Sequence, residues 1–281
     1  MKKYVIGIDV GGSITKIAGL EDGAVIGCLQ VKATDPLASL YGALGKFLSE
    51  TRISLDEVAR IMITGVGSSS VKKPVFGIPT SFVDEFFCTG RGGLFLSGLE
   101  KGVIVSMGTG TAFVYATPDS ISHIGGSGVG GGTLLGLSNA ILNVRDVKNL
   151  VKLAEGGNIL NVDLTISDIT VNPVSNLPPH ATASNFGKLS ELATQADIAL
   201  GLLNLVFQTI GMLAIFAVRS YNEDKVVLTG NVAEIPQARM LFDELGKMFA
   251  IDFILPENAR FATAIGAALS DGRVPQTEIV I

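Results

Sequence analysis

The chain is poor in the residues that build metal centres and disulfide frameworks. Only two cysteines, Cys28 and Cys88, and two histidines occur among the 281 residues. The cysteines lie far apart and form no CxxC pair, which predicts reduced thiols in a cytoplasmic protein and argues against a zinc site. Two histidines leave little room for a histidine-rich metal centre.

Positive charge and export signals are also scarce. The 21 basic and 26 acidic residues give a net charge of −5, and no block of lysine and arginine occurs. This balance argues against nucleic acid as a partner. The first predicted strand follows the N-terminus within a few residues, without an apolar h-region or a cleavage site. We therefore expect a cytoplasmic location.

Charge is absent from one long stretch, Ile198 to Val218, which has the length and polarity of a membrane-spanning helix. Asn204 and Gln208 lie one helical turn apart within it, and Gly201 and Gly211 add small positions. The rest of the chain has a soluble α/β pattern. The stretch is therefore interpreted as a buried central or interface helix, and no membrane is expected.

Glycine is abundant, and its first cluster follows a strand predicted over Tyr4–Asp9. In a Walker loop or a dinucleotide fingerprint the glycines lead into a helix. Here Ile14 to Leu20 continues as a strand, so Gly11, Gly12 and Ser13 lie at the tip of a hairpin. Backbone amides at such a tip can bind phosphate.

Two charged residues flank this tip. Asp9 supplies a hard oxygen ligand for the Mg²⁺ that accompanies a nucleotide. Lys16 could neutralise a transferred phosphoryl group. The alternatives are that Asp9 only caps the turn and that Lys16 is a solvated strand residue.

The same pattern recurs later in the chain. A strand over Val103–Met107 leads into Gly108, Thr109, Gly110 and Thr111, and the chain again continues as strand. These glycines and hydroxyls could bind a second part of the nucleotide phosphates.

A second echo supports a duplication. Ile61–Gly65 matches Val226–Gly230, because both are apolar strands that end in Thr-Gly. Helices are expected before each, over 37–51 and 197–221. We therefore predict a duplicated mixed-sheet α/β domain with a nucleotide cleft between residues 1–102 and 103–281. An insertion over about 143–195 is expected to be a lid or specificity region.

The densest glycine run, Gly125 to Thr133, precedes an apolar helix expected over Leu134–Leu142. A helix N-terminus after glycines can bind an anion through its amides and dipole. Gly130, Gly131 and Gly132 are therefore candidate nucleotide-binding residues. The alternative is a flexible linker.

Adjacent carboxylates in apolar surroundings give a candidate general base. Asp84 and Glu85 lie between Phe82-Val83 and Phe86-Phe87. Apolar packing raises the pKa of a carboxyl towards the range useful for a base, so Glu85 could accept a proton from an attacking hydroxyl. The alternative is that both acids cap a helix that starts near Phe86.

Taken together, six motifs resemble type II pantothenate kinases, a branch of the superfamily of actin, sugar kinases and heat-shock chaperone ATPases. The resemblance covers nearly the whole chain, and the motifs occur in the family's order: 8–13, 82–86, 107–111, 125–132, 182–187 and 256–261. It implies two ribonuclease H-like domains of the actin-like ATPase fold, with the nucleotide between them.

The resemblance further implies phosphorylation of pantothenate by magnesium-ATP, which opens coenzyme A synthesis, in a homodimer. Glu85 then matches the catalytic base, Asp9 and Lys16 serve magnesium and phosphate, and Thr182 matches a threonine that reaches the substrate. The glycine turns, with Gly230, would hold ATP.

Two positions depart from the family pattern. Ser122-His123 stands where bacterial members have an arginine that contacts pantothenate, and Leu255 stands where some members have a tyrosine. His123 is therefore the expected substrate contact at this place. An amino-sugar kinase that uses an aspartate base, and a sensor or activator ATPase that uses a cysteine-held iron–sulfur cluster, stay open as alternatives.

Overall fold

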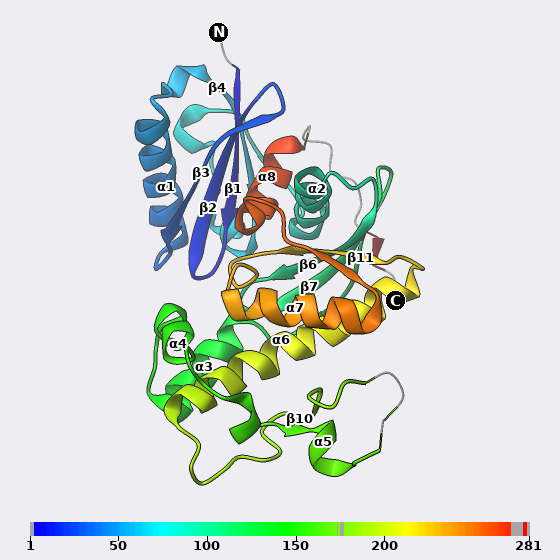
Figure 1. The fold of residues 1–281 in the computed structure, drawn as a ribbon. Helices are drawn as coiled ribbons and strands as arrows, with labels where there is room; N and C mark the ends of the chain where they lie inside the picture. The colour runs from blue at the N-terminus through cyan, green and yellow to red at the C-terminus, as the bar shows by residue number, and fades with distance from the viewer. Residues whose placement is uncertain (1–2, 173, 175–176, 271–277, 280–281) are drawn as a thin grey trace.

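Two β-sheets of matching topology organise the molecule (Figure 1). The computed structural model describes residues 3–172, 174, 177–270 and 278–279. The first sheet has the order β3-β2-β1-β4-β5, with strands β1 (Tyr4–Val10), β2 (Ile14–Glu21), β3 (Ala24–Lys32), β4 (Val58–Thr64) and β5 (Thr80–Phe82).

The second sheet repeats this order and adds one strand at its edge. Its order is β12-β11-β6-β7-β8-β13, with strands β6 (Gly102–Met107), β7 (Thr111–Ala116), β8 (Ile121–Ser127), β11 (Lys225–Thr229), β12 (Asp252–Ile254) and β13 (Glu278–Ile279). In each sheet three antiparallel strands come first, and two parallel strands then join the far side of the first strand. The predicted duplication of a mixed-sheet α/β unit is confirmed.

Local signals set the ends of the helices. The helices are α1 (Pro36–Thr51), α2 (Glu85–Ser97), α3 (Gly131–Leu142), α4 (Val147–Leu153), α5 (Ile166–Ile169), α6 (Gln195–Ser220), α7 (Pro236–Phe249) and α8 (Ala262–Leu269). Asp35 caps α1 by accepting a hydrogen bond from the amide of Ala38 at 2.7 Å, and Pro36 occupies the first helical position. Asp84 caps α2 in the same way through the amide of Phe87.

The sheets divide along the chain between β5 and β6, but two helices do not follow that division. α8 comes from the C-terminal half and packs Ala264, Ile265 and Ala268 against Ala18 and Leu20 of the first sheet. α2 follows the first sheet in sequence and packs Leu94 against Ile104, Val114 and Val227 of the second sheet. Because α2 and α8 also pack on each other, they join the two halves.

The long uncharged stretch is a core helix. α6 is long and apolar enough to cross a membrane by length and composition alone. Its side chains instead form the centre of the largest core cluster, where Leu203, Val206 and Ile210 are completely buried. The interpretation of this stretch as a buried central helix is confirmed.

The insertion packs against α6, and besides the helix α4, which the sequence pattern indicates, it contains structure that the pattern missed. It carries α4, α5 and a short antiparallel pair, β9 (Leu164–Thr165) and β10 (Thr182–Ser184). Asp197 in the first turn of α6 accepts hydrogen bonds from the amide of Asn158 at 2.6 Å and from the Asn161 side chain. These hydrogen bonds lower the pKa of Asp197 to about 2, and the bond from the Asn158 amide has the largest effect. They tie the insertion to the helix.

Candidate active site

A buried ion pair lies beside the tip of the first hairpin. Asp9 and Lys16 face each other across β1 and β2, with 3.8 Å between Oδ2 and Nζ. Each residue is 8 % exposed. Burial raises the pKa of the Asp9 carboxyl, and the positive charge of Lys16 only partly opposes this. Asp9 is thus a carboxylate that gains from a further positive charge.

Glu85 is electrostatically coupled to this pair. It is the first residue of α2 and remains accessible to solvent. A substrate can therefore reach it. Partial removal of its carboxyl from water by the surrounding protein, followed by the negative charges of Asp9 and Asp84, raises its pKa to about 6, while Lys16 acts in the opposite direction. The structure therefore brings together three of the residues that the sequence analysis selected for chemistry.

The neighbouring Asp84 has a structural role. Its carboxylate accepts the 2.8 Å hydrogen bond from the Phe87 amide that caps α2. Of the two adjacent acids, Asp84 therefore caps the helix. Glu85 follows the cap, and its carboxyl is the one whose pKa is raised to about 6.

Gly65 holds the backbone behind Asp9 in place. It follows β4 with φ +89°, and a Cβ built on it would lie 2.6 Å from Oδ1 of Asp9 and 2.7 Å from the carbonyl oxygen of Val10. Gly230, after β11, has φ +92° and approaches the backbone of Met107 in the same way. The repeated Thr-Gly thus places a glycine beside the end of the first strand in each sheet.

We expect Gly65→Ala to lower kcat by about tenfold to a hundredfold, because the new methyl group must displace Asp9. Gly77→Ala is the matched control, since Gly77 also has positive φ, +74°, but has open space around its Cβ position. Both variants should lower Tm through backbone strain. Only Gly65→Ala should impair turnover, and equal kcat values in the two variants would contradict the positioning role.

Both hairpin tips present unoccupied backbone amides. The first glycine of each tip donates its amide within the turn, from Gly11 to Ile14 and from Gly108 to Gly110. The amides of Gly12, Ser13, Thr109 and Gly110 have no hydrogen-bond partner among the residues that the structure describes. Gly12, Ser13 and Thr109 are also exposed. The two tips therefore offer the donors that a phosphate chain requires.

The glycine run differs from its sequence interpretation. Gly125 and Gly126 belong to β8, where they pair with β7, and α3 already begins at Gly131. The amides of Gly131 and Gly132 donate to the carbonyl oxygens of Gly108 and Thr109, at 2.9 and 2.8 Å. The run is not a flexible linker. It fastens α3 to the second tip, and two of its predicted phosphate-binding amides are engaged there.

Thr111 also holds this corner together. Its hydroxyl donates a 2.8 Å hydrogen bond to the carbonyl oxygen of Val129. The Thr111 hydroxyl proton is therefore engaged within the protein, whereas Thr109 at the exposed tip keeps its side chain accessible.

His123 lies next to α2. Its ring stacks on Phe86 with 3.9 Å between ring centroids and an angle of 11° between planes. Phe86 follows Glu85 directly in sequence, so the stack joins β8 to the first turn of α2. The prediction of His123 as a substrate contact did not foresee this aromatic partner, because β8 and α2 are far apart in sequence.

Thr182 lies elsewhere. It is in β10, on the opposite side of α6 from the two sheets (Figure 1), and its hydroxyl hydrogen-bonds to Asp163. Among the described residues, no hydrogen bond or ion pair links it to Asp9, Lys16 or Glu85. The structure therefore does not gather Thr182 with the other selected residues.

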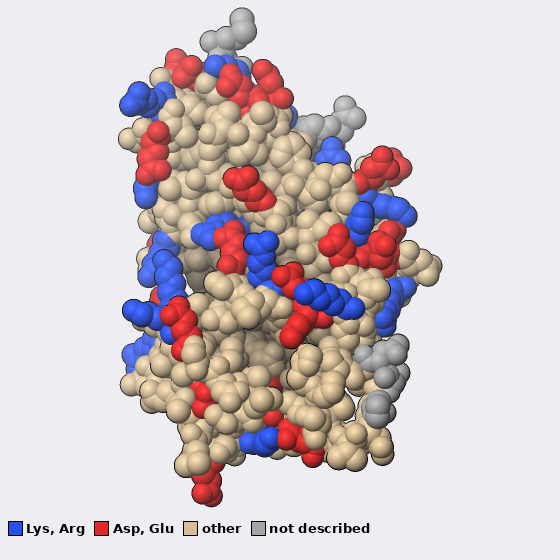
Figure 2. Space-filling model, viewed as in Figure 1, with Lys and Arg blue, Asp and Glu red and all other residues tan. Residues whose placement is uncertain are grey.

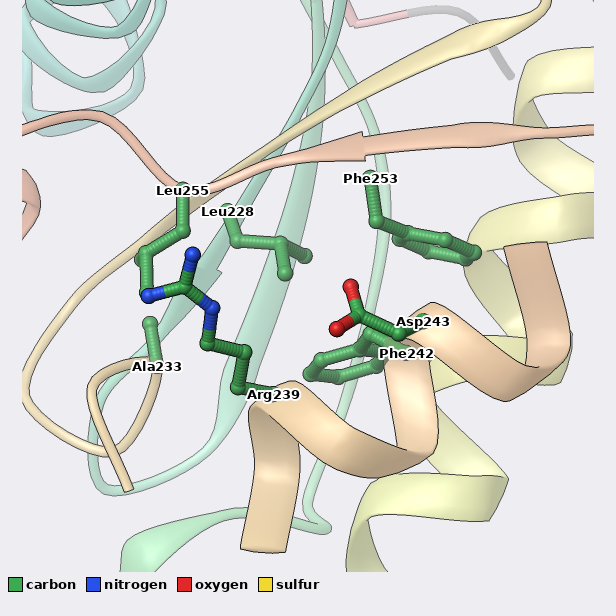
Figure 3. Close-up of a pocket in the computed structure, with 7 residues that line it drawn as sticks. All are labelled: Leu228, Ala233, Arg239, Phe242, Asp243, Phe253 and Leu255. Atoms are coloured by element: carbon green, nitrogen blue, oxygen red, sulfur yellow. The ribbon is translucent and has the colours of Figure 1, made fainter. Parts of the chain in front are cut away.

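Leu255 lines a small cavity of about 70 Å³ beside α7. Figure 3 shows the guanidinium of Arg239 next to the Leu255 side chain, with Asp243 one helical turn further along. Leu255 offers no hydroxyl at the position where the resemblance expects a tyrosine.

Sequence reasoning missed Gly65, although it had selected Gly230. The Thr-Gly echo was the available signal, since equivalent positions in a duplicated fold have similar backbone requirements. The sequence analysis also assigned Asp9 as the only protein ligand of a metal ion. Among the described residues no group of three or more histidine, cysteine, aspartate or glutamate side chains could hold a metal ion. A Mg²⁺ ion that keeps its waters and binds phosphates needs only one or two carboxylates.

Comparison with known proteins identifies the family of this chain. A family model, Fumble, matches residues 102–253, which is more than half of the chain. The chain belongs to the Fumble family. Relatives of this Fumble protein include a type II pantothenate kinase of Bacillus cereus, 28 % identical over 80 % of this chain and 82 % of that protein. A type II pantothenate kinase of Staphylococcus epidermidis is 26 % identical over 93 % and 98 %.

Solved structures identify the fold of this Fumble protein. The activator of the 2-hydroxyisocaproyl-CoA dehydratase from Clostridium difficile, with bound ADPNP, has a TM-score of 0.69 at 20 % identity, covering 95 % of this chain and 93 % of the other. A ROK family glucokinase from Streptomyces griseus, in complex with glucose and AMPPNP, has a TM-score of 0.60 at 11 % identity, covering 94 % and 98 %. The fold is that of the actin-like ATPases, as the resemblance implied.

Proposed function

We propose that this Fumble protein is an ATP-dependent pantothenate kinase, which forms 4'-phosphopantothenate in the first step of coenzyme A synthesis. The observation that carries the proposal is the carboxyl of Glu85, whose pKa is raised to about 6 beside the buried Asp9 and Lys16. The relatives named type II pantothenate kinase support the choice of substrate.

Each residue has a role in this proposal. Glu85 accepts the proton of the pantothenate hydroxyl that attacks the γ-phosphorus. Lys16 balances charge on the transferred phosphoryl group, and the free amides at the two hairpin tips hold the phosphates of ATP. The remaining glycines that the sequence analysis selected determine the backbone conformation in and beside these turns: Gly11, Gly108, Gly130, Gly131, Gly132 and Gly230.

A magnesium ion fits the donor set at Asp9. Burial raises the pKa of this carboxyl and Lys16 opposes that rise only in part, so the positive charge of a divalent cation would further stabilise the ionised form. Asp9 would hold the ion directly or through water, and the bound ion would neutralise phosphate charge.

A pH profile tests the base. A protonated carboxyl cannot accept a proton, so kcat/KM for pantothenate should fall as the pH drops through about 6. One pH unit below that value, kcat/KM should be about tenfold under its plateau. ATP binding measured over the same range is the control. A flat kcat/KM between pH 8 and pH 5 would contradict a base with this pKa.

A substitution of His123, which stacks on Phe86, tests how the substrate is recognised. We propose that His123 contacts pantothenate where related bacterial enzymes use arginine. His123→Arg would supply a permanent charge and a fork of donors, so KM for pantothenate should fall by about tenfold with little change in kcat. Pantothenol, which has no carboxylate, should gain nothing. A KM that falls equally for both substrates would contradict a contact with the carboxylate.

The activator-type alternative finds little support in the cysteines. Cys88 is fully buried in α2, and Cys28 is partly buried in β3. Burial raises the pKa of the Cys28 thiol to about 11 and that of Cys88 further. Thiolates bind iron–sulfur clusters, and these environments disfavour thiolates. The likeness to the dehydratase activator therefore extends to the fold alone.

A panel of alcohols tests the proposed substrate. Purified protein with magnesium-ATP should release ADP with pantothenate. Release with N-acetyl amino sugars instead would identify a different kinase of the superfamily, and release without any added alcohol would favour the sensor class. Pantetheine, which differs from pantothenate at the carboxylate end, tests whether the site accepts a change there.

We also propose that the protein is a cytoplasmic homodimer, as the resemblance implies. Sedimentation velocity at micromolar concentrations should give a single species of twice the chain mass. A monomer throughout that range would contradict this part of the proposal.

A further inference from the structure

Three polar side chains lie in a row across the first sheet, and the candidate active site includes two of them. Lys16 on β2 has Asp9 of β1 as its partner on one side and Gln30 of β3 on the other. These three strands run side by side in Figure 1. Directly opposed residues of antiparallel strands project from the same face, with about 4.5–5.5 Å between their Cβ atoms. Gln30 is therefore the second cross-strand neighbour of Lys16.

The row lies on the face of the sheet that packs against α8. Ala18 of β2 and Cys28 of β3 are partners in the same ladder, and both pack with Ala264 of α8. Side chains on one face of a strand recur at every second residue. Lys16 and Gln30 are each two residues from this packed pair, so both project from the face that α8 covers.

The ammonium of Lys16 and the carboxamide of Gln30 have complementary unmet hydrogen-bonding needs. Nζ of Lys16 is 3.8 Å from Oδ2 of Asp9, which is longer than the roughly 2.7–3.2 Å of a direct hydrogen bond. Among the described residues Nζ donates no hydrogen bond, although an ammonium carries N–H donors only. Oε1 of Gln30 is buried and has no hydrogen-bond partner there either. Beside a cation, the oxygen is the end of the carboxamide that is attracted.

Near neighbours determine where the Lys16 ammonium lies. Figure 2 shows basic and acidic side chains mixed over the visible face, and charges at an exposed surface are screened by salt. Glu85 is within electrostatic reach of Lys16, but a general base must keep its carboxylate for the substrate hydroxyl. Gln30 is then the acceptor left to Lys16 besides Asp9.

Asp9 cannot serve Lys16 and Mg²⁺ equally, because an ammonium and a divalent cation repel each other and compete for one carboxylate. We propose that Gln30 is a positioning residue, which accepts a hydrogen bond from Lys16 when Asp9 takes Mg²⁺ and so keeps the ammonium beside the transferred phosphoryl group. This inference rests on the proposed function, since it adds a residue to the same site.

The thermal shift caused by a nucleotide tests the role of Gln30 without turnover. The ATP analogue AMPPNP with Mg²⁺ should raise the Tm of the parent more than that of Gln30→Met, because the hydrogen bond from Lys16 forms only in the complex. AMPPNP with EDTA should raise both by the same amount. Without ligand, Gln30→Met should melt at or above the parent temperature, since methionine replaces an acceptor that has no partner. Gln30→Leu, a second apolar variant, should behave in the same way.

A double-mutant cycle connects the effect to the ammonium. In a Lys16→Met background, Gln30→Met should no longer change the Mg²⁺-dependent shift. Lys32→Met is the matched control, because Lys32 is exposed and lies two residues further along the same face of β3. It should give the parental shift. Equal Mg²⁺-dependent shifts in the parent and Gln30→Met would overturn the proposal, and so would a loss that persists in the Lys16→Met background.

Turnover gives a second and separable readout. Gln30→Met should lower kcat for pantothenate by about tenfold, the effect of losing a hydrogen bond to a charged group, while KM for pantothenate changes by less than about twofold. Gln30→Glu keeps an acceptor of the same reach and should restore most of kcat. A parental kcat in Gln30→Met would overturn the proposal. If the parent phosphorylates no pantothenate, the proposed function fails, and the thermal shifts with AMPPNP still decide the role of Gln30.

Discussion

Glu85→Gln should lower kcat for pantothenate phosphorylation by about 10²- to 10⁴-fold and leave the dissociation constant of ATP nearly unchanged. This range is the usual contribution of a general base. Glutamine preserves the size and the hydrogen-bonding reach of the side chain but cannot accept the hydroxyl proton. The loss should therefore appear in single-turnover rates of phosphoryl transfer and not in nucleotide binding.

The matched control is Glu50→Gln, which alters an exposed glutamate on α1. It should retain parental kcat and KM. Equal losses of turnover and ATP affinity in Glu85→Gln would contradict the base assignment, because they would indicate a damaged nucleotide site. Retention of the low-pH fall in kcat/KM in this variant would contradict it as well.

Asp9→Asn should have the second largest effect, a fall in kcat of about 10²- to 10³-fold, or roughly 3–4 kcal/mol in the barrier. Asparagine keeps the shape of the side chain but removes the charge that would hold Mg²⁺. The concentration of Mg²⁺ that gives half-maximal rate should therefore rise, and this is the measurement that separates metal binding from general damage.

Asp22→Asn is the control for this substitution. Asp22 lies in the exposed turn between β2 and β3 with φ +48°, a conformation that asparagine tolerates. It should leave the Mg²⁺ dependence unchanged. A low kcat in Asp9→Asn with an unaltered Mg²⁺ dependence would contradict the proposed metal role and would leave Asp9 with a purely structural one.

The parts of the fold that local pattern determines could be predicted from sequence. The glycine tip at Gly11 and Gly12 is followed by alternating strand residues, so the hairpin and its echo at Gly108 were foreseen. The first residues of α1 and α7 follow from a proline at the first helical position. Duplication followed from the common order of these signals.

Non-local contacts account for most of what was missed. β5 has only three residues, two of them exposed, and it is a strand because β4 pairs with it. Gly125 and Gly126 extend β8 because β7 supplies partners, although glycine itself does not favour a strand. The exchange of α2 and α8 between the sheets joins segments more than 150 residues apart.

The candidate site divides in the same way. Asp9 and Lys16 could be predicted because they flank one turn, and Glu85 because its neighbours are apolar. The engagement of Gly131 and Gly132 by the second tip, and the stacking of His123 on Phe86, depend on how distant segments pack. Sequence alone carries no signal for such contacts.

The measurement that tests the central proposal most directly is product identification. Purified protein, magnesium-ATP and pantothenate should yield 4'-phosphopantothenate by mass spectrometry, in equal amount to the ADP released. The Glu85→Gln variant should form neither product at a comparable rate. ADP without phosphopantothenate, or phosphopantothenate formed equally well by Glu85→Gln, would contradict the account.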